Sequence, residues 1–174
     1  MADTYTLREA VAEDMRYLRP MHGQSWLATY PSEEAGVSYE WVKLRTDKWR
    51  EPEMMAQSIE ILKNILNSPD HFYRLAETKD EIVGLVHVKV NEDLTKELEA
   101  IYTLPATFGT GLGQQLMDAA LEYIGSTPTT LKVANYNNRA IRFYEKNGFK
   151  KVEGSEELYA ETIPMITMKR EGAL

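Results

Sequence analysis

Hydrophobic and polar positions along the chain recur with two periods, and each period predicts one kind of element. Period-two alternation and short apolar runs are typical of strands. Apolar residues three or four positions apart are typical of helices with one buried face. We therefore expect strands at residues 5–8, 72–76, 82–90, 98–104, 131–134, 149–153 and 163–168. We expect helices at 13–27, 38–49, from Pro52 to a breaker at 68–70, 112–124, and between Asn137 and Gly148.

The order of these elements predicts an α/β protein built on a mixed sheet. A strand is followed by three helices, a hairpin, a strand, a helix, a strand, a helix and a second hairpin. Turn-forming residues, among them Pro31 and Gly36, separate the first two helices. Pro164 is expected near the start or the edge of the last strand, because proline cannot donate a ladder hydrogen bond. No linker or repeat divides the chain, so we expect one domain over residues 1–174.

Charge and composition narrow the class of partner. Lys and Arg total 20 against 27 Asp and Glu, a net charge of −7. This balance disfavours nucleic acid and is compatible with a cationic substrate such as an amine. No apolar run approaches the roughly 20 residues of a membrane span. Residues 1–4 lack the features of a signal peptide, so we expect a cytoplasmic protein without a membrane partner.

The absence of cysteine limits the chemistry further. It excludes disulfides, thiolate metal sites and a cysteine nucleophile. His22 and His71 show no ligand spacing with carboxylates, and we expect no metal.

A run of alternating glycines is the first candidate binding motif. Gly109, Gly111 and Gly113 follow the strand at 98–104 and open the helix at 112–124. Bare backbone N–H groups at a helix N-terminus favour phosphate. The run is neither a P-loop nor a dinucleotide fingerprint, because Gln114 and Gln115 follow the last glycine. A plain loop before an amphipathic helix remains the alternative.

A second motif follows the strand at 131–134. Asn137 suits a helix N-cap, and Gly148 suits the residue after the helix end. Together the two segments resemble the GNAT superfamily of acyl-CoA-dependent N-acetyltransferases. The family's first motif reads Gln/Arg-x-x-Gly-x-Gly/Ala, and its second reads Asn-x-x-Ala-x-x-x-Tyr-x-x-x-Gly-Phe. The chain matches both with Gly111, Gly113, Asn137, Ala140, Tyr144, Gly148 and Phe149, whereas Phe108 stands at the usual Gln/Arg position.

The resemblance implies a fold and a cofactor site. It implies a mostly antiparallel sheet of about seven strands, flanked by helices and splayed between the fourth and fifth strands. Acetyl-CoA would lie in the gap, its pantetheine beside the fourth strand and its pyrophosphate on the glycine turn. The implied cofactor contacts are Ile101, Tyr102, Thr103, Gly109, Thr110, Gly111, Leu112, Gly113, Gln114, Asn137 and Tyr144.

Acetyl transfer to an amine needs an acid and a base. The resemblance makes Tyr144 the acid that protonates the departing thiolate, although helical spacing alone favours core packing for it. The matching position in histone-type relatives makes Glu97 the first candidate base. Glu99 is the second, since alternation places it on the same strand face, opposite Leu98 and Ala100; a bulge near Tyr102 would shift this register.

The sequence leaves the identity of the general base open. Both carboxylates could be solvated charges at a strand end. His87 is a further candidate, although a lone histidine is more often structural. Lys132 stands where some ribosomal-protein acetyltransferases carry a glutamate.

The acceptor site and the overall activity follow from the same resemblance. The early helices roof the acceptor site in that family, so Trp26 and Tyr30 are expected to shape it, with core packing as the alternative. Without cysteine, the acetyl group should pass directly from acetyl-CoA to a primary amine of a small molecule, a polyamine or a peptide. A non-catalytic acyl-CoA sensor or scaffold is the competing function. A homodimer is also considered, because dimers are common in the family.

Overall fold

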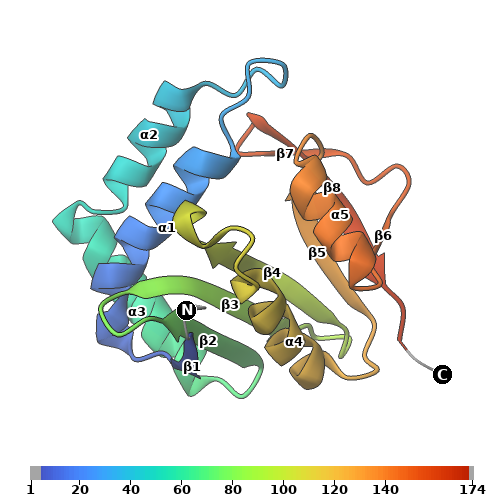
Figure 1. Ribbon diagram of the computed structural model, residues 1–174, viewed down its shortest axis with the longest axis horizontal. Helices are drawn as coiled ribbons and strands as arrows, with labels where there is room; N and C mark the ends of the chain where they lie inside the picture. Colours follow the sequence, from blue (N-terminus) through green and yellow to red (C-terminus); the bar gives the residue numbers. More distant parts are fainter. Residues whose placement is uncertain (1–4, 173–174) are drawn as a thin grey trace.

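An eight-stranded mixed sheet runs through the computed structural model, which describes residues 5–172 (Figure 1). The strands follow the order β1-β2-β3-β4-β5-β8-β6, and β7 pairs with β8 outside this path. All pairs are antiparallel except β4 with β5. The strands are β1 (Thr6–Glu9), β2 (His71–Glu77), β3 (Ile82–Val90), β4 (Lys96–Thr103), β5 (Thr129–Ala134), β6 (Lys150–Lys151), β7 (Glu157–Tyr159) and β8 (Ile163–Arg170).

Helices cover both faces of this sheet (Figure 1). Gly84 and Leu85 are neighbours in β3, so they face opposite sides of the sheet. A Cβ built on Gly84 would lie 3.1 Å from Leu116 of α4, whereas Leu85 lies in a cavity wall with Leu18 of α1 and Leu62 of α3. One face is therefore covered by α4 and the other by α1 and α3. The helices are α1 (Met15–Thr29), α2 (Tyr39–Lys48), α3 (Pro52–Asn67), α4 (Leu112–Ile124) and α5 (Asn138–Lys146), with 3₁₀ turns at Ala12–Asp14 and Pro105–Thr107.

The predicted α/β class and the mostly antiparallel sheet are confirmed. Helical spacing also identified the buried face of α4. Five of the six expected residues are buried, namely Leu112, Leu116, Met117, Ala120 and Ile124, and the sixth, Leu121, is partly buried. Pro164 lies at the second position of β8, close to the expected strand start.

Most element bounds differ from the prediction by one or two residues, and the largest differences concern β7, β6 and α1. The strand β7 was not expected, because its three residues are all exposed and leave no alternating pattern. The strand β6 is only two residues long. Helix α1 begins at Met15, after a 3₁₀ turn, rather than at residue 13. The segment 1–4, on which the expectation about a signal peptide rests, lies outside the described residues, as do residues 173–174.

The strands β4 and β5 pair over only three positions, Lys96–Leu98 with Thr129–Leu131. Beyond Leu98, β4 continues beside β3 alone. The expected separation of the fourth and fifth strands is thus present. It leaves an internal strand edge, which presents N–H and C=O groups that a closed ladder would have paired. Across residues 5–172, no helix is both long enough and apolar enough to cross a membrane.

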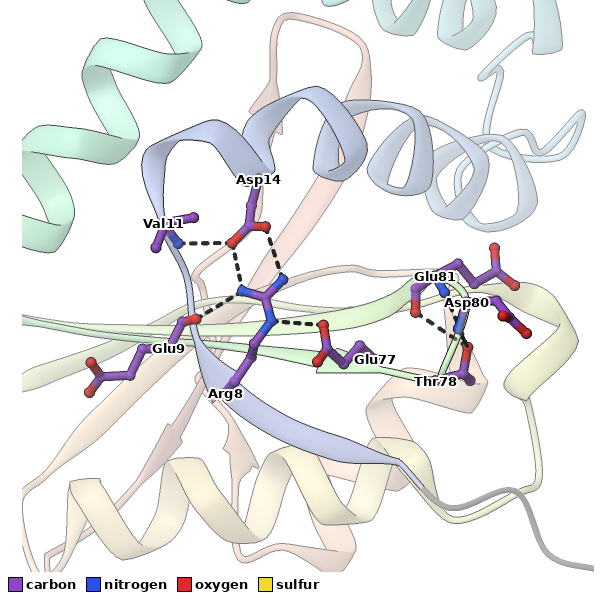
Figure 2. Close-up of polar contacts among 8 residues, drawn as sticks. All are labelled: Arg8, Glu9, Val11, Asp14, Glu77, Thr78, Asp80 and Glu81. Atoms are coloured by element: carbon purple, nitrogen blue, oxygen red, sulfur yellow. Dashed lines mark hydrogen bonds and ion pairs between the residues drawn. The ribbon is translucent and has the colours of Figure 1, made fainter.

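An ion-pair network ties β1 to the turn that precedes α1 (Figure 2). The Arg8 guanidinium donates to both carboxylate oxygens of Asp14, at 2.7 and 2.9 Å, and to Glu77 at 2.7 Å. The backbone N–H of Val11 also donates to Asp14, at 2.8 Å. Burial by itself would raise the pKa of Asp14, but these hydrogen bonds outweigh burial and hold the pKa below its ordinary value.

Replacing Asp14 by asparagine is expected to lower the free energy of unfolding at pH 7 by about 1–3 kcal/mol, because Asp14 is only 7% exposed and its donors lose a charged acceptor. The carboxylate stabilises the fold fully above its unfolded pKa of about 4, and this contribution is lost as pH falls through the lowered folded pKa. The difference between the proteins should therefore shrink in acid. Urea unfolding at pH 7 and at pH 3 measures both effects.

Asp47→Asn is the matched control, because Asp47 on α2 forms exposed ion pairs with Lys43 on the same helix and with Arg50 just after it. Such pairs contribute little to stability. Equal losses for the two variants would show that the Arg8–Asp14 network has no special role.

Candidate active site

A cavity of about 260 Å³ occupies the gap where β4 and β5 separate. The C-terminal part of α1, the turn before α4 and the partly buried side of α5 complete its wall. Residues from five elements thus meet in one place, although they are far apart in the sequence. The lining includes Ser25, Thr29, Tyr30, Leu98 to Thr103, Thr107, Phe108, Gly109, Gly113, Lys132, Val133, Ala134, Asn137, Arg139, Ala140, Phe143 and Tyr144.

The glycine turn forms one end of this cavity. Gly109 has φ +80° and Gly111 has φ +92°, a left-handed conformation that favours glycine. Gly111 is the N-cap of α4, and the first N–H to bond within the helix is that of Gln115, to the Gly111 carbonyl at 3.0 Å. The N–H groups of Leu112, Gly113 and Gln114 therefore have no intrahelical acceptor. A helix N-terminus with free donors at a cavity rim is suited to an anion.

Arg139 adds a positive charge beside this turn, and the sequence analysis missed it. Its guanidinium carbon lies 3.6 Å from the centroid of the Phe108 ring, and both residues line the cavity. Phe108 replaces a polar residue of the family motif, so Arg139 supplies from α5 a charge that the turn itself lacks. Its place in the first turn of α5, two positions after Asn137, was the available signal.

The side chain of Tyr144 reaches the cavity wall while its ring packs against Phe143 and Phe149, with centroids 5.6 and 6.1 Å away. Within the described chain, its hydroxyl has no hydrogen-bond partner. Burial, and next the neighbouring Tyr102, raise the pKa of Tyr144 above its ordinary value. The ring thus packs as a core residue would, and the hydroxyl stays protonated and available at neutral pH.

Asn137 caps α5, as expected, because its Oδ1 accepts a hydrogen bond from the N–H of Ala140 at 3.1 Å. It also lines the cavity.

Aromatic residues form the α1 side of the site. The hydroxyls of Tyr30 and Tyr102 lie 2.8 Å apart, and Tyr136 donates to the Tyr30 carbonyl at 2.7 Å. Burial raises the pKa of both Tyr30 and Tyr102, so both remain neutral. Tyr30 lines the cavity, whereas Trp26 lies behind it, donating its indole N–H to Nε2 of His22 at 2.8 Å. The structure therefore brings only Tyr30 of the two expected acceptor residues to the wall.

A β-bulge decides where the candidate carboxylates lie. Leu98 pairs with Val88 and Ala100 pairs with His87, so Glu99 is the extra residue. This places the bulge before Ala100 rather than near Tyr102. Glu97 pairs with Lys89 and Ala100 pairs with His87, so both lie on the α1 side of β4, and the expectation of simple alternation along this strand is wrong.

Glu99 lines the cavity, whereas Glu97, the first candidate base, does not. Burial raises the pKa of Glu97, and the nearby charge of Glu99 raises it further. Lys132 opposes this effect and lies in the cavity wall, where its ammonium pairs with Glu157 at 2.5 Å. The carboxylates of Glu97 and Glu99 therefore lie near one lysine, Lys132, whose charge is already paired with Glu157, so the β4–β5 side of the site is acidic.

His87, the other candidate base, faces a different cavity beneath α1 and α3. Its Nε2 lies 2.8 Å from Nδ1 of His71, and burial lowers its pKa to about 4. No cluster of three or more potential metal-ligating side chains occurs in the described ranges.

The remaining expected cofactor residues divide into two groups. Ile101, Tyr102, Thr103, Gly109 and Gly113 line the cavity, whereas Thr110, Gly111, Leu112 and Gln114 do not. Leu112 is fully buried in the core, so only its backbone is available at the turn. The Thr110 hydroxyl donates to the Thr107 carbonyl at 2.7 Å, and Gln114 donates to Asp118 at 2.7 Å.

Comparisons with known proteins agree with this architecture. A family model described as the Acetyltransferase (GNAT) family matches residues 38–149. An uncharacterized N-acetyltransferase of Mycobacterium tuberculosis is 35% identical over 88 residues, which are 49% of this chain and 56% of that protein. The uncharacterized N-acetyltransferase YjgM of Escherichia coli is 28% identical over 102 residues, 55% of this chain and 61% of that protein. The chain thus spans little more than half the length of the curated relatives it matches.

Solved structures show the same fold over nearly the whole chain. The PaiA N-acetyltransferase of Thermoplasma acidophilum, solved in complex with coenzyme A, has a TM-score of 0.71 at 21% identity, covering 97% of this chain and 99% of that chain. A GNAT-family acetyltransferase of Streptococcus pneumoniae has a TM-score of 0.74 at 20% identity, and the match covers 98% of this chain and 100% of that chain.

Proposed function

The chain belongs to the acetyltransferase (GNAT) family, and on this basis we propose that it transfers an acetyl group from acetyl-CoA directly to a primary amine. One observation carries the proposal: the break between β4 and β5 opens a cavity that has the glycine turn at its rim and Tyr144 and Glu99 in its wall. A phosphate-binding end and an acid–base pair thus meet in one place. The acceptor is a small molecule, a polyamine or a peptide amine.

Acetyl-CoA is held by backbone groups and by Arg139 in this proposal. The pyrophosphate lies on the free N–H groups at the start of α4, with the Arg139 guanidinium beside it. The pantetheine follows the unpaired edge of β4 at Ile101, Tyr102 and Thr103. A relative of the same fold, PaiA, was solved with coenzyme A.

The reaction proceeds in one displacement at the thioester carbonyl. The neutral amine nitrogen attacks this carbon and forms the C–N bond, and the C–S bond breaks as the tetrahedral intermediate collapses. Tyr144 donates its hydroxyl proton toward the departing sulfur. Glu99 accepts the proton that the amine loses, directly or through water. The position of Glu99 in the wall favours it over Glu97.

Replacing Glu99 by glutamine is expected to lower kcat/KM at pH 7 by about ten- to a hundredfold, the modest end of general-base effects. An aliphatic amine with a pKa of about 10 is mostly protonated at this pH, and the variant must rely on the small neutral fraction. The rate of the variant should therefore climb with pH, and its deficit should shrink toward pH 10. The measurement is the pH profile of thiol release.

Glu97→Gln is the matched control on the same strand. A changed profile for Glu97→Gln alone would move the base to that residue. Wild-type profiles for both variants would leave water or His87 as the base and contradict the assignment of Glu99.

Turnover itself separates an enzyme from an acyl-CoA sensor or scaffold. Thiol release from acetyl-CoA is measured with polyamines, amino acids, aminoglycosides and N-terminal peptides as acceptors. The proposal expects amine-dependent release with at least one class. Tight binding of acetyl-CoA with no amine-dependent release from any class would instead favour the sensor.

A further inference from the structure

A second cavity, of about 170 Å³, lies beneath α1 and α3 on the face of the sheet opposite α4. Its wall is mostly apolar and includes Met15, Leu18, Ile61, Leu62, Ile65 and Leu85. Five polar side chains share the wall: Arg19, His22, Ser58, Tyr73 and His87. The reaction proposed for the first cavity uses none of them.

Arg19 is a cation without a carboxylate partner among residues 5–172. Its Nε and Nη2 donate to Oγ of Ser58, at 3.0 and 2.7 Å, and its guanidinium carbon lies 5.0 Å from the Trp49 ring centroid. Ser58 in turn donates its own proton to the Met54 carbonyl at 2.8 Å. Partial burial lowers the pKa of Arg19, so the surroundings disfavour its charge. An anion is the group that this guanidinium lacks.

The other titratable groups in this wall are neutral at pH 7. Burial lowers the pKa of His87 to about 4 and that of His22 to about 3. Burial also raises the pKa of Tyr73 to about 12. In the wall as described, Arg19 therefore supplies the only full positive charge, and it lies beside an apolar surface. A ligand that suits both has a carboxylate and a small apolar body.

The second cavity adjoins the first at the reacting end of β4. Ala100 lines both cavities and directly follows Glu99, the candidate base. His22 lines the second cavity, and its ring lies 4.4 Å from that of Tyr102, which lines the first. The two cavities therefore share part of their wall at Ala100, next to the candidate base.

We propose that the cavity beneath α1 binds the carboxylate end of the acceptor, so that the preferred acceptors carry an amine and a carboxylate at opposite ends of a short apolar chain, as ω-amino acids do. This inference rests on the proposed acetyl transfer and names its substrate class. Arg19 holds the carboxylate, the apolar wall takes the body of the molecule, and Glu99 faces the amine. The acidic side at β4–β5 and the lone guanidinium thus match the two ends of a zwitterion.

The test compares acceptors that differ only by the carboxylate. The pairs are 4-aminobutanoate with propylamine, 5-aminopentanoate with butylamine, and 6-aminohexanoate with pentylamine. In the wild-type protein, kcat/KM should favour the carboxylate-bearing member of at least one pair by about ten- to a hundredfold, the effect expected of a hydrogen bond to a charged group. Equal values within every pair would overturn the proposal and leave acetyl transfer intact.

Two variants locate the effect. Arg19→Gln should abolish the preference within the pair. Arg16→Gln, an exposed arginine on the same helix, should keep the preference. The change in this preference between the wild-type protein and a variant is a ratio of ratios, so a general structural defect and the difference in amine pKa between the two acceptors both cancel. A preference that survives in Arg19→Gln would overturn the role of Arg19.

A binding measurement keeps the inference testable if no amine releases thiol, an outcome that contradicts the proposed function. Calorimetric titration with the same three carboxylates should then show binding to the wild-type protein and none to Arg19→Gln. The absence of binding to either protein would overturn the carboxylate site as well.

Discussion

Tyr144→Phe is expected to lower the turnover number by about 10²–10⁴-fold, the range for loss of a general acid. The substitution removes only the hydroxyl, which faces the cavity without a partner among the described residues. The ring contacts with Phe143 and Phe149 remain, so the free energy of unfolding and the affinity for CoA should change little. Steady-state kinetics, calorimetry with CoA and urea unfolding together measure the three quantities.

Tyr123→Phe is the matched control. Tyr123 lies on α4, stacked on Phe72 with centroids 4.8 Å apart, and it lines a different pocket. Removal of the Tyr123 hydroxyl in this variant should leave the turnover number unchanged. If Tyr144→Phe turns over as fast as the wild type, Tyr144 is a packing residue and not the acid.

Gly111→Val is expected to weaken the binding of CoA by at least about tenfold, which is about 1.4 kcal/mol of binding free energy. At φ +92° a β-branched residue is strained, although no protein atom lies within 4 Å of the position of an added Cβ. The turn must therefore change its backbone conformation, and the N–H groups at the start of α4 lose their common direction. Titration of the folded variant with CoA measures the effect.

Gly154→Val controls for backbone strain alone. Gly154 has φ +71° and equally open surroundings, but it lies in the turn between β6 and β7, away from the cavity wall. Both variants should lose stability, and only Gly111→Val should lose affinity. Unchanged affinity in a folded Gly111→Val protein would contradict the assignment of the pyrophosphate to this turn.

Local patterns predicted most of the helices and strands, because these elements form through interactions between residues that are close in the chain. The helical spacing of α4 marked the residues that the sheet buries, and Asn137 marked the start of α5 because its side chain caps the helix within three residues. The strand β7 was missed because its residues are exposed and only pairing with β8 makes it a strand. The bulge at Glu99 was not predicted for a related reason, since a bulge is a property of two strands together.

Residue patterns along the chain were enough to establish the α/β class, the element order and the two motifs that lead to the GNAT family. These features depend on side-chain periodicity and on a few capping and glycine positions, which near neighbours in the chain decide. The folded arrangement was needed to show that Glu99 rather than Glu97 lines the cavity, that Trp26 lies behind Tyr30, and that Arg139 stands beside Phe108. It also placed Arg19 in a second cavity that shares Ala100 with the first. Each of these depends on strand register or on contacts between elements distant in sequence, which no local pattern encodes.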